Sequence, residues 1–170
     1  MEEKTAAIGK SLSIGVYILW SASFLIPFAV SGPQLATGSI VNCLLFISAR
    51  NLNWKALLPV AILPSIGALA HGAVFGPATP FLLFFLPFIW FGNIVLIWTF
   101  KNIKVFDIAK VFLAAGIKSA FLFLLANLYF NFHLVPKLFI TSMGMFQFYT
   151  AIIGGVLALV VLSLIKKNAN

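Results

Sequence analysis

The sequence predicts an all-α fold: one integral membrane domain, residues 1–170, built as a bundle of six transmembrane helices with both termini in the cytoplasm. The first observation is composition, because 62% of the 170 residues are apolar, 8% are charged and the mean hydropathy is +1.12. Soluble domains carry about a quarter charged residues. The second observation is that long apolar stretches alternate with short segments containing Gly, Pro or Lys. The third is the uneven distribution of basic residues.

The six predicted helices follow one another with short connections. The first ends near Pro27, and the second is short for a full crossing. The third contains two prolines, which predict a kink. A Gly/Pro loop from His71 to Thr79 precedes the fourth, which opens with a proline as many helices do. The expected ranges are Ile8–Ala29, Gly38–Ala49, Ala56–Ala70, Pro80–Phe100, Asp107–Phe130 and Leu138–Ile165.

Basic residues gather on one face of this predicted topology. Six spans put both termini on the same side of the membrane, and the positive-inside rule places the more basic side in the cytoplasm. The connections around Gly32, Phe75 and Phe132 then lie outside, where Lys137 is the one basic residue. The formal charge of +8 is therefore a topology signal, and we expect no nucleic-acid partner. The cytoplasmic side carries Lys4, Lys10, Arg50, Lys55, Lys101, Lys104, Lys110, Lys166 and Lys167.

A lysine inside the fifth predicted helix is the strongest chemical clue. Lys118 lies between two uncharged apolar runs, Val111–Ile117 and Ser119–Phe130, and about 12 Å from the basic end of its helix at ~1.5 Å per residue. A charge at that depth costs free energy and usually faces a bundle interior, a wet cavity or a ligand. The alternative is a lysine whose stem extends to the cytoplasmic headgroups. Asn127, nine positions on, points the opposite way at about 100° per residue.

Polar side chains within the spans are few, and each needs a partner because lipid offers none. Asn93, Lys118 and Gln147 lie at comparable depth on three successive helices, with Trp90 and Tyr129 nearer the outside. We expect these five residues to form a pocket for a small, partly aromatic molecule bearing an acidic group. Unrelated interhelical hydrogen bonds are the alternative. The main polar set within the spans is Asn42, Asn93, Lys118, Asn127 and Gln147.

The titratable residues argue against catalysis and against a metal centre. The three acids, Glu2, Glu3 and Asp107, all fall on the predicted cytoplasmic side, so neither paired carboxylates nor a Ser-His-Asp set can be assembled in the membrane. His71 and His133 could meet above the pocket, but two histidines without an acidic residue make a poor metal site. The sequence also lacks a Gly-rich nucleotide-binding loop ending in Gly-Lys-Ser/Thr. We therefore predict no enzymatic activity, no metal and no cofactor.

Length, span number, terminal placement and several short motifs together resemble a known family. The chain resembles the substrate-binding S components of energy-coupling factor (ECF) vitamin transporters. The resemblance covers nearly the whole chain and is more topological than motif-based. The local matches are Gly32-Pro33-Gln34, Thr37-Gly38 and Val41-Asn42 around the first outward loop, Phe75-Gly76-Pro77 in the second, and Gly92-Asn93 in the fourth helix.

The resemblance implies a multi-pass protein of the prokaryotic plasma membrane that captures a small vitamin-like solute from outside. A transmembrane coupling subunit and two cytoplasmic ATPases would then supply the energy for import. The family docks on its coupling subunit through small residues spaced by four on the first helix, where this chain has Ala7, Ser11 and Gly15, with Ser and Gly where Ala is usual. The family's binding region, carried over, implicates Gln34, Phe75, Trp90, Asn93, Lys118, Tyr129 and Gln147 in substrate binding.

Two other classes of function stay open at this point. A self-sufficient oligomeric carrier or channel for small solutes would work in vesicles without an ATPase module. A membrane scaffold without a ligand would pair its mid-membrane polar residues with one another and would have no outward cavity. The substrate itself is not fixed by one chain, so vitamins, nucleobase-like compounds, amino-acid derivatives and chelated metals are all compatible with the sequence.

Overall fold

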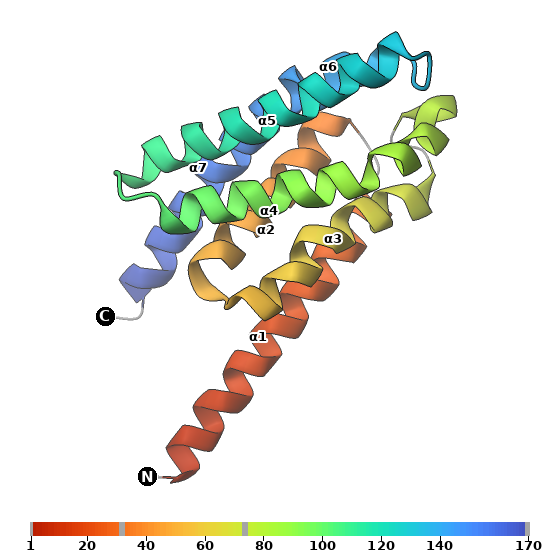
Figure 1. Ribbon diagram of the computed structural model, residues 1–170. Coiled ribbons are helices and arrows are strands. Elements are labelled where there is room, and N and C mark those ends of the chain that lie inside the picture. The colour runs from red at the N-terminus through yellow and green to blue at the C-terminus, as the bar shows by residue number, and fades with distance from the viewer. Residues whose placement is uncertain (1, 31–32, 73–74, 169–170) are drawn as a thin grey trace.

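The described residues form a bundle of six helical rods, two of which, Gly76–Asn102 and Leu138–Asn168, each consist of two consecutive helices. Figure 1 shows their arrangement. The structure is a computed structural model that describes residues 2–30, 33–72 and 75–168, with side chains described from Ile14 onward. These residues contain no strand, which confirms the predicted all-α fold. The elements are α1 (Glu2–Ala29), α2 (Gln34–Asn51), α3 (Trp54–His71), the 3-10 helix η1 (Gly76–Phe85), α4 (Leu86–Asn102), α5 (Asp107–Asn131), α6 (Leu138–Met143) and α7 (Met145–Asn168).

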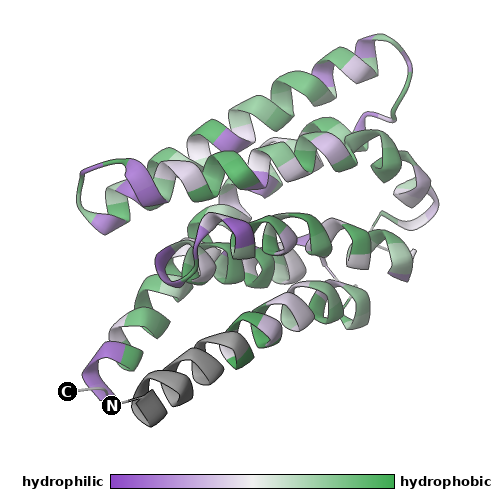
Figure 2. Ribbon diagram, turned by 60° about the horizontal axis from the view of Figure 1, so that its bottom comes forward, coloured by the Kyte–Doolittle hydropathy of each residue, from purple (hydrophilic) through white to green (hydrophobic). Residues whose placement is uncertain are grey.

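Four of the rods are long and apolar enough to cross a bilayer, and they indicate a membrane protein. They are Trp54–His71, Gly76–Asn102, Asp107–Asn131 and Leu138–Asn168, whereas the described side chains of α1 form a shorter apolar stretch, Ile14–Ala29. Figure 2 shows hydrophobic positions along the helices, with the most hydrophilic ones mainly at helix ends and connections. The helix α2 is less apolar because it carries several polar residues that the bundle buries. They are Thr37, Ser39, Asn42 and Ser48.

Several predicted elements differ from the observed ones, and Gly and Pro account for two of the differences. The loop predicted to run to Thr79 ends sooner, because Pro77 stands at the first turn of η1, where its fixed φ suits a helix start. The last predicted helix is broken in two at Gly144, whose backbone at φ −94° and ψ −94° lies outside the helical range. The helix α2 also begins earlier than predicted, at Gln34.

The topology places both described ends of the chain on one side of the bundle. In Figure 1 the start of α1 and the end of α7 lie on the same side as the α2–α3 and α4–α5 connections, with the α5–α6 connection opposite. We call the side with the two chain ends the basic end, and the side with the α5–α6 connection the cavity end. The basic end carries Arg50, Lys101 and Lys110, together with Asp107, whose carboxylate lies 2.9 Å from Lys110 Nζ and 3.5 Å from Arg50 Nη1.

Close helix packing holds α2 against α7 and α1 against α3. A Cβ added at Gly154 of α7 would lie 2.5 Å from Ser39 O and 2.7 Å from Cys43 N, so only glycine allows this approach of the two backbones. At Gly67 of α3, an added Cβ would collide with Phe24 O of α1. Glycines therefore let these helices approach closely where lipid provides no hydrophobic drive.

Candidate functional site

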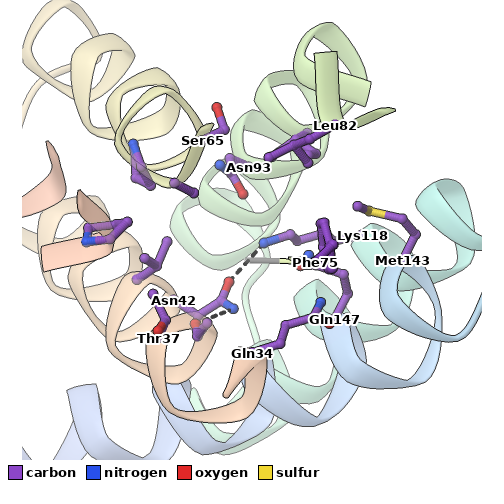
Figure 3. Close-up of a pocket in the computed structure, with 16 residues that line it drawn as sticks. Gln34, Thr37, Asn42, Ser65, Phe75, Leu82, Asn93, Lys118, Met143 and Gln147 are labelled. Carbon is purple, nitrogen blue, oxygen red and sulfur yellow. Dashed lines mark hydrogen bonds between the residues drawn. The ribbon is translucent and has the colours of Figure 1, made fainter. Parts of the chain in front are cut away.

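A cavity opens in the half of the bundle near the cavity end, and every helix of the bundle contributes to its wall (Figure 3). It contains about 640 Å³ of empty space, part of which is open to the surroundings. Sixteen residues line it: Pro27, Gln34, Thr37, Gly38, Val41, Asn42, Pro64, Ser65, Ala68, Phe75, Leu82, Ile89, Asn93, Lys118, Met143 and Gln147.

Lys118 is the one charged residue of this lining. Its side chain is 2% exposed, and its stem packs beside Gly92 of α4, where an added Cβ would lie 3.5 Å from Lys118 Cγ. Nζ donates a hydrogen bond of 2.8 Å to Asn42 Oδ1. The lysine therefore stays inside the bundle and does not extend to the headgroups, which was the alternative left open by its position in the sequence.

The partner of Lys118 belongs to a polar network that joins α2, α5 and α7. Asn42 is 2% exposed, and its Nδ2 donates to Gly38 O at 2.9 Å and to Thr150 Oγ1 at 3.2 Å. Thr150 Oγ1 in turn donates to Gln147 O at 3.2 Å. Because Lys118 can only donate, the amide oxygen of Asn42 must face it, which fixes the orientation of the amide. The network holds the ammonium at the cavity wall by neutral groups alone.

No carboxylate compensates the Lys118 charge within the cavity lining. Of the three acids in the chain, Asp107 is paired with Arg50 and Lys110 at the basic end, and Glu2 and Glu3 fall in the first turn of α1, where side chains are not described. A buried cation without a counter-ion is costly in a low-dielectric setting. The cavity is therefore electrostatically prepared for an anionic group.

Asn93 supplies an unused acceptor on the same wall. Its side chain is 2% exposed, and Nδ2 donates to Ala61 O of α3 at 2.8 Å. Since a carbonyl can only accept, the amide nitrogen must face Ala61, and Oδ1 is left buried without a partner. Buried polar atoms normally find one, so an unsatisfied oxygen at a cavity is a candidate ligand contact.

Two glutamines line the cavity in different states. Gln34 Nε2 donates to Ser142 O at 2.9 Å, which ties the first turn of α2 to the end of α6 beside the break at Gly144. The side chain of Gln147 makes no hydrogen bond within the described part of the chain and is half-buried. Gln147 therefore has a free amide to offer a ligand, whereas Gln34 already stabilises the wall.

Trp90 and Tyr129, predicted to stack on a substrate, do not line the cavity. Trp90 Nε1 donates to Ser65 Oγ at 2.7 Å, so the indole touches the lining residue Ser65 from behind. The Tyr129 ring packs against Phe85 and Phe88, with centroid distances of 5.3 and 5.7 Å. Of the seven residues predicted to bind substrate, the structure brings together at the cavity Gln34, Phe75, Asn93, Lys118 and Gln147.

The predicted docking stripe on α1 is described only at its last position. The side chains of Ala7 and Ser11 lie outside the described residues, so the structure gives no account of them. Gly15 is exposed, and a Cβ added there would meet nothing within 4 Å.

The sequence reasoning missed the contribution of α2 and α3 to the site. Asn42 was recognised as a mid-membrane polar residue, but its contact with Lys118 joins positions 76 apart, which no local pattern reveals. Gly38, noted in the sequence only in the Thr37-Gly38 match, lines the cavity, and so does Ser65. The one signal available was the density of polar residues on α2, which lowers its hydropathy below that of the other spans.

In comparisons with known proteins, no family model, no curated protein and no solved structure matches the chain. The resemblance to S components therefore stays a hypothesis that rests on the sequence features given above.

Proposed function

We propose that this protein is a membrane-embedded substrate-capture subunit that binds a small, vitamin-like anionic solute in the cavity around Lys118. The observation that carries the proposal is a buried ammonium with one neutral partner, Asn42, at the wall of a cavity. Binding an anion there would supply the counter-ion that the chain itself does not place in the lining.

The direction of capture follows from the basic residues. By the positive-inside rule the basic end faces the cytoplasm, so the cavity end faces outward, and a solute would enter from outside. The proposal places the protein in a prokaryotic cell membrane and assigns delivery of the solute to a transmembrane coupling subunit with two ATPases. Support for that delivery step comes from the resemblance to S components and from the absence of a nucleotide-binding loop in the sequence.

Lys118→Met is the direct test of capture. Small molecules released from the purified wild-type protein are identified by mass spectrometry, and the affinity of the molecule found is then measured on both proteins. We expect a loss of about tenfold to a hundredfold, because a hydrogen bond to a charged group contributes roughly 1.5–3 kcal/mol. Lys110→Met is the matched control: it removes the same charge from the same helix at the basic end. Unchanged affinity in Lys118→Met contradicts the proposed role of the lysine.

Vesicle uptake tests the delivery step separately. Efficient uptake that requires co-reconstituted coupling and ATPase subunits supports the capture-subunit proposal. Uptake by vesicles that contain this protein alone supports the self-sufficient carrier or channel instead.

A further inference from the structure

We infer that the captured solute is a monoanion that carries an N–H or O–H donor near its acidic group, with an otherwise apolar body. This inference rests on the proposed function and names the chemical class of its substrate. Its basis is the pair of polar groups that the folded cavity leaves unsatisfied, one on Lys118 and one on Asn93.

The free N–H donors of Lys118 indicate that the solute carries an acidic group. An ammonium has three N–H donors, and Asn42 Oδ1 uses one. Two charged donors are left for an acceptor in the cavity, and carboxylate oxygens form shorter and stronger hydrogen bonds with such donors than neutral acceptors do. A cationic solute would instead meet uncompensated repulsion.

The free acceptor of Asn93 indicates that the solute also carries a hydrogen-bond donor. No hydrogen bond joins Asn93 Oδ1 to Lys118, although both residues line the same cavity and the Lys118 stem packs beside Gly92. In Figure 3 the amide oxygen of Asn93 is turned toward the side on which the Lys118 nitrogen lies. A solute that bridges the two must accept from the lysine and donate to the asparagine. An anion without a donor would leave Oδ1 buried and unpaired, which costs free energy.

The remaining wall sets the charge limit and the character of the solute body. Lys118 is the one cation of the lining, so the second charge of a dianion such as a phosphate monoester would be buried without compensation. Most of the surrounding surface is apolar, from residues such as Pro64, Phe75, Leu82 and Met143, with the free amide of Gln147 at one side. This environment suits a compact aromatic or aliphatic body.

A panel of pure compounds of known charge tests the class. The panel consists of matched sets, such as indoleacetate (monoanion with a ring N–H), N-methylindoleacetate (monoanion without it), indoleacetamide (neutral) and tryptamine (cation), together with dicarboxylates. Each compound is scored by the shift it causes in the thermal midpoint of the purified protein, since a ligand that binds the folded state stabilises it. We expect the largest shift from a monoanion with a donor. A largest shift from the monoanion without a donor or from a dicarboxylate overturns the inference but leaves capture of an anion intact. A largest shift from the neutral or the cationic compound, or no shift from any compound, overturns the proposed function as well.

A mutant cycle on Asn93 tests the donor contact itself. The probes are the best-stabilising acid of the panel and its N- or O-methylated analogue, which lacks the donor. In the wild type, methylation should weaken binding about tenfold, and in Asn93→Leu it should have no further effect. Asn127→Leu is the matched control on α5, because Asn127 Nδ2 donates only to Phe123 O and does not line the cavity. An equal effect of methylation in wild type and Asn93→Leu overturns the contact.

Asn93→Asp provides an independent test of the charge limit. The new carboxylate would stand on the wall beside Lys118 as a built-in counter-ion. The substitution also removes the Nδ2 donor to Ala61 O, so the thermal midpoint is not the readout, and we expect the variant to lose binding of the same acid. If Asn93→Asp keeps wild-type affinity for the acid, the inference that the cavity accepts only one negative charge is wrong.

Discussion

Two lysines show how the two ends of the bundle differ. At the basic end, Lys101 Nζ donates to Ala49 O and Leu52 O, both at 3.1 Å, and so satisfies carbonyls at the C-terminus of α2. Deeper in the bundle, Lys118 has a single neutral partner and faces a cavity. The first cation completes a helix end, where positive charge is favourable. The second lies at a cavity wall whose lining contains no acidic residue.

The packing around the two lysines follows the same division. The core near the basic end is closed, with Leu45, Phe46 and Leu96 at 0% exposure and the Phe46 and Phe100 rings 4.9 Å apart. Near the cavity end, Leu82 and the apolar lining face empty space on one side. The comparison teaches that the half near the basic end is packed without a cavity, although Ser48 Oγ there is buried without a partner. The half near the cavity end leaves empty space beside its lining and leaves Asn93 Oδ1 without a partner.

The largest expected effect is on stability, from matched leucine truncations in the two halves. Leu96→Ala should lower the free energy of unfolding by about 2–5 kcal/mol, because it leaves a hole in a closed core. Leu82→Ala should cost clearly less, since that side chain already borders the cavity and loses fewer contacts. Denaturant unfolding in detergent micelles measures both. Equal losses would show that the two halves are packed alike.

A pair of lysine substitutions should move stability in different directions when no solute is bound. Lys101→Met leaves two carbonyls at the end of α2 without a donor, and we expect the thermal midpoint to fall by about 2–4 °C. Lys118→Met also leaves one acceptor, Asn42 Oδ1, without a donor, but it removes a buried charge that has no counter-ion in the cavity lining, and the second effect is the larger, so the midpoint should equal or exceed that of the wild type. If the thermal midpoint of Lys118→Met falls as far as that of Lys101→Met, the two lysines do not differ in the way described.

The sequence predicted the closed half of the bundle better than the cavity. Apolar stretches and basic clusters act over short distances, so the six helices and the shared side of the two described ends could be derived from composition and order. Lys118 could also be selected, because a charge in an apolar run is visible in one helix. Its partner Asn42 could not be selected, because it lies on another span, one that the hydropathy pattern marked only as short, and only the folded bundle brings the two residues together.

The aromatic residues show why the cavity wall could not be completed from the sequence. Depth along a helix can be counted from residue numbers, but the direction of a side chain depends on which neighbours pack beside it. Trp90 was placed at the correct depth, yet it turns to Ser65 of α3 and stays behind the lining. Tyr129 shares the Lys118 side of α5 but fills an aromatic cluster with Phe85. Tertiary packing decided both.

The smallest expected effects come from these two aromatic residues and place a limit on the cavity. Trp90→Phe replaces the indole with a smaller aromatic ring and removes the N–H donated to Ser65 Oγ, and because the indole lies behind the lining, affinity for the solute should change by less than about threefold. Tyr129→Phe keeps the ring packed against Phe85 and Phe88 and should leave affinity unchanged. Gln147→Leu is the internal reference, because losing its free amide at the lining should weaken binding about tenfold. Affinity measurements on the three variants distinguish residues that contact the solute from residues that only support the cavity wall. A tenfold loss of affinity in either aromatic variant would mean that its ring contacts the solute, as the sequence predicts.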